Sequence, residues 1–194
     1  STWAVLGSGI DVIPNDLLAL PNGDIVAGGF VSAVSSKVRQ WNGSAWSSLG
    51  SGMNNTTVCL TRLPNGDIVA GGNFTMAGGV AANRIARWDG SNWVPLGSGM
   101  NATVTNLVVM PNGDLIACGS FTTAGGVPAN RIARWDGVTW SAIGTGMDSQ
   151  IDALAIMANG DLIAGGGFTT AGGVPTLYLA RWDGVAWSPL GTAV

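Results

Sequence analysis

Eight tryptophans recur in this chain at a fixed interval of 47 residues, two in each repeat and five positions apart. The triplet NGD also recurs four times, with spacings of 43, 47 and 47 residues, and the short first spacing reflects a four-residue deletion between Gly29 and Trp41. Such regular self-similarity indicates a repeat architecture, in which neighbouring units share a continuous core. The tryptophans are Trp41, Trp46, Trp88, Trp93, Trp135, Trp140, Trp182 and Trp187.

The third repeat carries strand and turn signals along its whole length. Residues 103–110 (TVTNLVVM) are β-branched and apolar, and the following PNGD supplies an Asn-Gly turn typical of hairpins. Further strands are predicted over 115–121, 130–135 and 139–144, and no segment keeps a helical period. Four short antiparallel strands per repeat are typical of a propeller blade. We therefore predict an all-β fold, a β-propeller of four 47-residue, four-stranded antiparallel blades within one domain over 1–194.

The two ends of the chain complicate the number of strands. Residues 3–9 (WAVLGSG) repeat the fourth-strand motif that also ends the chain as WSPLGTAV. We expect an extra outer strand over 1–10, followed by blades over about 11–53, 54–100, 101–147 and 148–194. One of these two terminal copies of the fourth strand is then redundant in a closed monomer. Three arrangements stay open: a four-bladed ring with one displaced strand, two chains in an eight-bladed ring, or a segment of a longer array.

Charge is sparse and scattered along the chain. Eight Lys and Arg face eleven Asp, for a net charge of −3, and the arginines form no basic cluster, which argues against a nucleic-acid partner. No apolar run approaches the roughly 20 residues of a spanning helix, so we expect no membrane insertion. The Gly/Thr/Asn-rich loops suit an extracellular or cell-surface protein.

The residue types that usually carry catalysis are few. The chain has no His and no Glu, and seven of its eleven Asp lie in turns. We therefore expect no enzyme and no catalytic residues. Calcium-loop and CxxC motifs are missing, so no metal site and no cofactor are predicted. Cys59 and Cys118 occupy unrelated repeat positions and are predicted to be free buried thiols.

The repeat unit resembles known propeller families. The pattern W-x-x-L-G-x-G, then P-N-G-D-L-I-A-G-G-x-F, then I-A-R-W-D-G resembles kelch-type and related bacterial or fungal cell-surface propeller repeats over essentially the whole chain. It is more faintly similar to tachylectin-type lectin propellers, whose family binds amino sugars. The sugar-contacting residues of that family do not match here one by one, so its ligand is not carried over. Propellers host many functions, and the resemblance implies the fold.

The loop between the second and third strands is the part of the repeat most free to bind a ligand. In the third repeat it reads TTAGGVPAN (122–130), and the first repeat has lost it. Asn and Arg hydrogen bonds beside an aromatic platform suit sugar recognition. The alternative is that these residues only order the loop, while the arginines of the ARW motif pair with turn aspartates. The candidate ligand-binding residues are Asn83, Arg84, Asn130, Arg131 and Tyr178, and the tryptophans are assigned to the blade core.

These observations favour a non-catalytic extracellular or cell-surface propeller that acts as a structural, assembly or binding scaffold. One alternative is a lectin-like carbohydrate-binding module with repeated sites; it predicts several ligands per chain and loss of binding on Asn130→Ala with Arg131→Ala. The other is an engineered or excised repeat fragment that oligomerises into a larger ring. The expected partners are a second copy, joined through terminal strands, and a glycan or protein ligand. Assembly through these strands predicts that deletion of 1–9 changes the oligomeric state.

Overall fold

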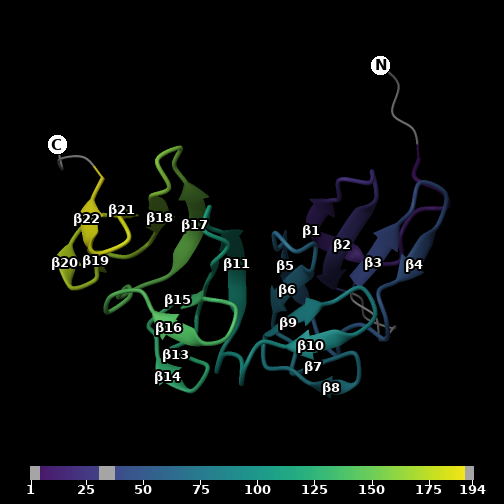
Figure 1. Ribbon diagram of the computed structural model, residues 1–194, viewed down its shortest axis with the longest axis horizontal. Coiled ribbons are helices and arrows are strands. Elements are labelled where there is room, and N and C mark those ends of the chain that lie inside the picture. Colours follow the sequence, from purple (N-terminus) through teal and green to yellow (C-terminus); the bar gives the residue numbers. More distant parts are fainter. Residues whose placement is uncertain (1–4, 31–37, 191–194) are drawn as a thin grey trace.

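The computed structural model describes residues 5–30 and 38–190. Four four-stranded antiparallel sheets follow one another around an arc (Figure 1), which confirms the predicted propeller blades. Blade 1 consists of β1 (Ile13–Ala19), β2 (Ile25–Phe30), β3 (Val38–Trp41) and β4 (Trp46–Ser48). Blade 2 consists of β5 (Thr57–Arg62), β6 (Ile68–Gly72), β9 (Ile85–Trp88) and β10 (Trp93–Pro95). Blade 3 consists of β11 (Val104–Val109), β12 (Leu115–Gly119), β15 (Ile132–Trp135) and β16 (Trp140–Ala142). Blade 4 consists of β17 (Ile151–Ile156), β18 (Leu162–Gly166), β21 (Leu179–Trp182) and β22 (Trp187–Pro189).

The loop between the second and third strands contains a small hairpin that the sequence did not predict. In blade 3 its two glycines, Gly125 and Gly126, take φ values of 60° and 85°, as a tight two-residue hairpin turn requires. The hairpins of blades 2, 3 and 4 are β7 (Met76–Ala77) with β8 (Val80–Ala81), β13 (Thr123–Ala124) with β14 (Val127–Pro128), and β19 (Thr170–Ala171) with β20 (Val174–Pro175).

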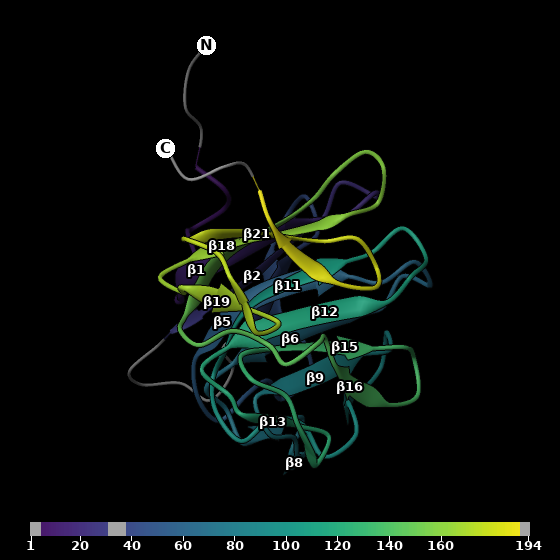
Figure 2. The same cartoon turned by 90° about the vertical axis from the view of Figure 1, so that its left-hand side faces the viewer.

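Neighbouring blades pack face to face along the arc. The innermost strands are in contact from blade to blade, β1 with β5, β5 with β11 and β11 with β17 (Figure 1). Figure 2 shows β1, β5 and β11 of this series from another side. A hydrophobic cluster fills each of the three interfaces. Each cluster contains one phenylalanine with no exposed surface, and these are Phe74, Phe121 and Phe168. Along β15, Ala133 and Trp135 belong to the cluster shared with blade 2, while Ile132 belongs to the cluster shared with blade 4. Successive side chains of this strand therefore pack on opposite faces of the blade.

The tryptophans lie on the two outer strands of every blade. The two rings of each pair are tilted, with centroids 5.3 to 5.6 Å apart. The second tryptophan of blades 2, 3 and 4 also ties its blade to the preceding one. The indole nitrogens of Trp93, Trp140 and Trp187 donate to the carbonyl oxygens of Leu49, Leu96 and Ile143, at 2.8, 2.9 and 3.0 Å.

The extra N-terminal strand stays a prediction. Residues 1–4 lie outside the described part of the chain, and residues 5–10 form no strand. Gly7 nevertheless contacts blade 1 in a repeat-like way: a Cβ on Gly7 would lie 2.9 Å from Cζ3 of Trp41, as a Cβ on Gly50 would lie 2.8 Å from Cζ3 of Trp88.

Candidate functional site

The antiparallel order of the strands gives the arc two distinct faces. The NGD and DG turns lie on one face, called here the turn face. The small hairpins and the linkers from one blade to the next lie on the other, called here the loop face. The loop face carries all five candidate ligand-binding residues named from the sequence.

A polar residue from each linker holds the hairpin of the following blade. The side-chain oxygen of Asn101 accepts hydrogen bonds from the backbone N–H groups of Thr122 and Thr123, at 2.9 and 3.1 Å, and its amide nitrogen donates to the Thr122 hydroxyl at 2.8 Å. Asn54 holds the hairpin of blade 2 in the same way, and Asp148 holds that of blade 4. Because these partners lie 21 and 22 residues apart in the sequence, no local sequence motif predicts the hydrogen bonds between them.

The aspartate in this set makes one hairpin sensitive to pH. Asp148 accepts a hydrogen bond from the Thr169 hydroxyl at 2.6 Å, and others from the backbone N–H groups of Thr170 and Thr169. These bonds lower the pKa of the Asp148 carboxyl from 3.8 to about 2. Since the pKa is lower in the folded chain, the stabilisation is present above pH 3.8 and is lost as the pH falls through about 2.

We expect acid to loosen the hairpin β19–β20 before β13–β14. Between pH 3.8 and about 2, the amide resonance of Thr170 should shift with the titration of Asp148, while that of Thr123, held by a neutral asparagine, stays in place. Asp148→Asn should remove the shift of Thr170. NMR titration measures both amides in one sample, and equal shifts at the two positions would refute the assignment.

The two candidate asparagines make bonds within the fold. The side-chain amides of Asn83 and Asn130 donate to the carbonyl oxygens of Ser98 and Thr145, both at 3.0 Å. The backbone carbonyl oxygens of Asn83 and Asn130 accept hydrogen bonds from the backbone N–H groups of Met100 and Met147 in the next linker, at 3.0 and 3.2 Å. Each asparagine therefore joins its loop to the following blade, as the loop-ordering alternative expects.

The next residue in each loop has an unusual backbone. Arg84, Arg131 and Tyr178 have φ values of 68°, 64° and 65°, in the left-handed region where side chains other than Gly are uncommon. Backbone bonds fix this conformation, because the N–H of Arg84 donates to the Phe74 carbonyl at 2.8 Å and its own carbonyl accepts the Gly72 N–H at 2.9 Å. Such strain tends to persist at functional positions. The same backbone conformation recurs at this position in blades 2, 3 and 4.

The two arginines differ in their side-chain contacts. The Arg84 guanidinium donates from Nη1 to the Phe74 carbonyl at 3.3 Å, and its buried Nε has no hydrogen-bond partner among the residues that the structure describes. The Arg131 guanidinium donates from Nη1 to the Met147 carbonyl at 2.9 Å. Tyr178, at the same position in blade 4, is 59% exposed.

Arg84 lines a polar pocket between blades 2 and 3. The pocket has a volume of about 420 Å³, and its wall includes Asn83, Ser98, Asn101 and Thr123. The structure thus brings Asn83 and Arg84 together in one hollow. Asn130, Arg131 and Tyr178 occupy the loops of the following blades and do not contribute to this pocket.

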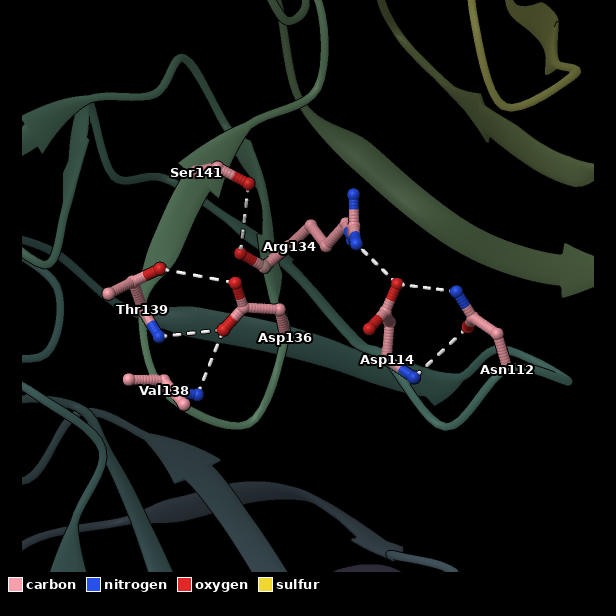
Figure 3. A network of polar contacts seen from close by, with 7 residues as sticks. All are labelled: Asn112, Asp114, Arg134, Asp136, Val138, Thr139 and Ser141. Atoms are coloured by element: carbon pink, nitrogen blue, oxygen red, sulfur yellow. Dashed lines mark hydrogen bonds and ion pairs between the residues drawn. The ribbon is translucent and has the colours of Figure 1, made fainter.

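On the turn face, by contrast, the arginines are paired with aspartates. Figure 3 shows Asp114 of blade 3, whose Oδ2 accepts hydrogen bonds from Asn112 Nδ2 and Arg134 Nε, both at 2.6 Å. Blades 2 and 4 repeat the ion pair as Arg87–Asp67 and Arg181–Asp161. In blade 1, Gln40 replaces the arginine and donates to Asp24 at 2.6 Å. The ion pairs found among the described residues leave Arg84 and Arg131 uncompensated.

The DG turns use their carboxylates for the backbone. Asp136 Oδ1 accepts the N–H groups of Thr139 and Val138, at 2.8 and 2.9 Å (Figure 3). These bonds, with that of Thr139 the larger, hold the pKa of Asp136 below its ordinary value. Asp89 and Asp183 have the same arrangement. These carboxylates therefore stay ionised near neutral pH and serve the turns.

The remaining reactive groups are buried or dispersed. Cys59 and Cys118 are both free and buried, and desolvation raises the pKa of both thiols, that of Cys118 to about 12. Within residues 5–30 and 38–190, no three potential metal-ligating side chains gather. The described part of the chain also contains no helix with the length and hydropathy to span a membrane.

A second hollow lies on the turn face, again between blades 2 and 3. It measures about 340 Å³ and is lined by Leu63, Pro64, Arg87 and Trp135 among others. Its wall is more apolar than that of the loop-face pocket, and its arginine is already paired with Asp67.

Comparison with known proteins supports the propeller. A family model described as a domain of unknown function (DUF5122) beta-propeller matches residues 63–89 and 111–135. The curated proteins contain no match to the chain.

Several solved structures share the fold at low sequence identity. The structure described as YCF48 bound to D1 peptide has a TM-score of 0.53 and 20% identity, over 88% of this chain and 51% of that one. The WD40 repeats of RRP9 have a TM-score of 0.63 and 12% identity, over 93% and 51%. The extracellular domain of a one-component system from B. thetaiotaomicron has a TM-score of 0.59 and 13% identity, over 92% and 22%. The chain spans about half the length of the first two. Its sheets, the family model and these structures together show a β-propeller repeat protein.

Proposed function

We propose that this chain is a non-catalytic binding scaffold that holds an anionic ligand on its loop face. The observation that carries the proposal is the uncompensated guanidinium of Arg84 in a polar pocket of about 420 Å³. A guanidinium presents a planar fork of donors that matches a carboxylate or sulfate. Within the described part of the chain, Nη1 of Arg84 donates to the Phe74 carbonyl at 3.3 Å, and its Nε has no hydrogen-bond partner.

The rest of the pocket favours a ligand rich in hydroxyl groups. Ser98 and Thr123 bring hydroxyl groups to its wall, and Asn83 and Asn101 bring amides. A wall of this kind suits the hydrogen-bonding edges of a sugar, and the arginine adds a preference for negative charge. An acidic glycan is therefore the ligand class that we propose, in a lectin-like and extracellular setting. The similar loops of blades 3 and 4 would provide weaker secondary contacts through Arg131 and Tyr178.

The test compares acidic and neutral oligosaccharides by calorimetric titration. We expect the wild-type chain to prefer uronic-acid or sulfated oligosaccharides, and Arg84→Gln to weaken binding about tenfold or more, because a charge-assisted hydrogen bond is lost. Arg84→Lys should retain part of the affinity. The matched control is Arg62→Gln, which removes the same charge from an exposed position of β5. Equal binding of neutral and acidic sugars, or an unchanged affinity of Arg84→Gln, would refute the proposal.

A peptide ligand on the turn face is the second candidate. The hollow lined by Leu63, Pro64 and Trp135 offers an apolar surface beside a paired arginine. A structural neighbour, YCF48, is described as bound to a peptide. A peptide held there would be weakened by Pro64→Asp and left unaffected by Arg84→Gln, the reverse of the pattern expected for the glycan.

A further inference from the structure

The first blade exposes a leucine that the inner blades bury. Leu60 and Leu107 lie at the same register in the innermost strands of blades 2 and 3, each opposite an alanine of the next strand, and are 7% and 5% exposed. Leu17 has this register in β1, opposite Ala27, and is 60% exposed. The inner leucines are covered by the preceding blade, whereas the described residues before β1 form no blade that could cover Leu17.

The last blade exposes the opposite kind of face. Val38, Ile85 and Ile132 begin the third strands of blades 1 to 3, and all three are fully buried against the following blade. Leu179 begins the third strand of blade 4 and is 38% exposed. Leu190, which follows β22, is 40% exposed, whereas its equivalents Leu49, Leu96 and Ile143 are 2% to 4% exposed.

These two exposed faces are complementary, because the fold already joins such faces three times. Val38 packs in one cluster with Leu60, and Ile85 packs in one cluster with Leu107. Leu179 occupies the position of Val38 and Ile85 in its blade, so the face of blade 4 that carries it can pack against a leucine at the position of Leu17. The same apolar packing that joins neighbouring blades can therefore join blade 4 of one chain to blade 1 of another.

A missing hydrogen bond marks the same junction. Among residues 5–30 and 38–190, the buried indole nitrogen of Trp46 has no hydrogen-bond partner, although its equivalents in blades 2 to 4 donate to a carbonyl of the preceding blade. The carbonyl at the equivalent position of blade 4 belongs to Leu190. A buried donor left unpaired costs free energy, on the order of 1–3 kcal/mol, which a partner's carbonyl would recover.

We propose that a second copy of this chain docks the Leu17 face of its blade 1 onto the Leu179 face of blade 4, and that the reciprocal contact closes an eight-bladed ring. Two copies supply about the length of the solved propellers of which one copy covers 51%. Two identical head-to-tail interfaces related by a twofold axis close without a free end. Arg39 and Asp11 of blade 1 form an ion pair with each other, so each already has its counter-charge.

The N-terminal segment competes with the second copy. Gly7 contacts Trp41 as Gly50 of the preceding blade contacts Trp88, so residues 5–9 occupy part of the place where the partner's blade 4 would end. Leu6 remains 45% exposed, unlike the 4% of Leu49, and does not fill that place fully. We therefore expect deletion of residues 1–9 to tighten the dimer.

The first experiment measures the mass in solution by sedimentation velocity over a concentration series. We expect a monomer–dimer equilibrium with no larger species. Leu17→Asp and Leu179→Asp should each raise the dissociation constant about a hundredfold or more, because each places an unpaired carboxylate in both interfaces. Val138→Asp is the control, since Val138 is 78% exposed in a turn of blade 3.

A mixture of the two variants tests the head-to-tail geometry. Leu17→Asp keeps an intact Leu179 face and Leu179→Asp keeps an intact Leu17 face, so together they can form one wild-type interface. We expect the mixture to give an open dimer, weaker than the wild-type ring, whereas either variant alone stays monomeric. Failure of the mixture to associate, a monomeric wild-type chain at all concentrations, growth into large species, or a weaker dimer after deletion of 1–9 would each overturn the proposal.

Discussion

Gly166→Ala is expected to destabilise the protein by about 3 kcal/mol, because the new methyl group has no room. Gly166 ends β18 and pairs with Ile151 immediately before an irregularity in the register of the inner hairpin. A Cβ at this position would lie 2.2 Å from the Gln150 carbonyl oxygen and 2.9 Å from the Ile151 Cα. Both obstacles are backbone atoms, so relief requires the two strands to move apart.

The following residue provides the control. Gly167 has a backbone that any residue can adopt, and a Cβ there would meet nothing closer than 3.6 Å, the Cγ of Gln150. We expect Gly167→Ala to be neutral or to stabilise by a few tenths of a kcal/mol, because alanine reduces the entropy of the unfolded chain. Urea unfolding of both variants measures the difference. Equal midpoints for the two would show that the inner hairpin tolerates the added methyl group.

The same bulge glycine recurs in every blade, which explains part of the repeat. Gly29, Gly72 and Gly119 each leave only 2.0 to 2.2 Å between a built Cβ and a carbonyl oxygen of the facing strand. The second glycine of the G-G-x-F pattern is therefore a requirement of the inner hairpin. The recurrence of this glycine therefore has a structural reason within the inner hairpin.

The blades could be predicted from the sequence because their signals are local and repeated. The 47-residue period, the Asn-Gly turns and the alternation of Ile132 and Ala133 each report on residues close in the chain. The hairpin of the second loop was missed although its Gly-Gly pair, Gly125 and Gly126, is a recognised turn signal.

The remaining features depend on contacts between distant residues. The bond from Asn101 to Thr122 joins positions 21 residues apart, and the left-handed φ of Arg84 is fixed by the surrounding backbone bonds. Local sequence signals also could not predict that the blades form an open arc. Leu17 and Leu179 read as ordinary core residues of their repeats, and only the arrangement of whole blades shows that both are exposed.

Phe121→Ala is expected to cost about 3 to 5 kcal/mol of unfolding free energy, because it empties space inside a closed interface between blades. Phe121 has no exposed surface and lies in the cluster shared by blades 2 and 3, with Ile85 and Val104. Phe30→Ala is the control, since Phe30 is 47% exposed at the end of β2 and should change the stability by less than about 0.5 kcal/mol. Thermal and urea unfolding of both variants measure the two changes in unfolding free energy. If the two phenylalanines cost the same, the interfaces between blades would not hold the arc together as separate closed cores, and stability would reside within the individual sheets.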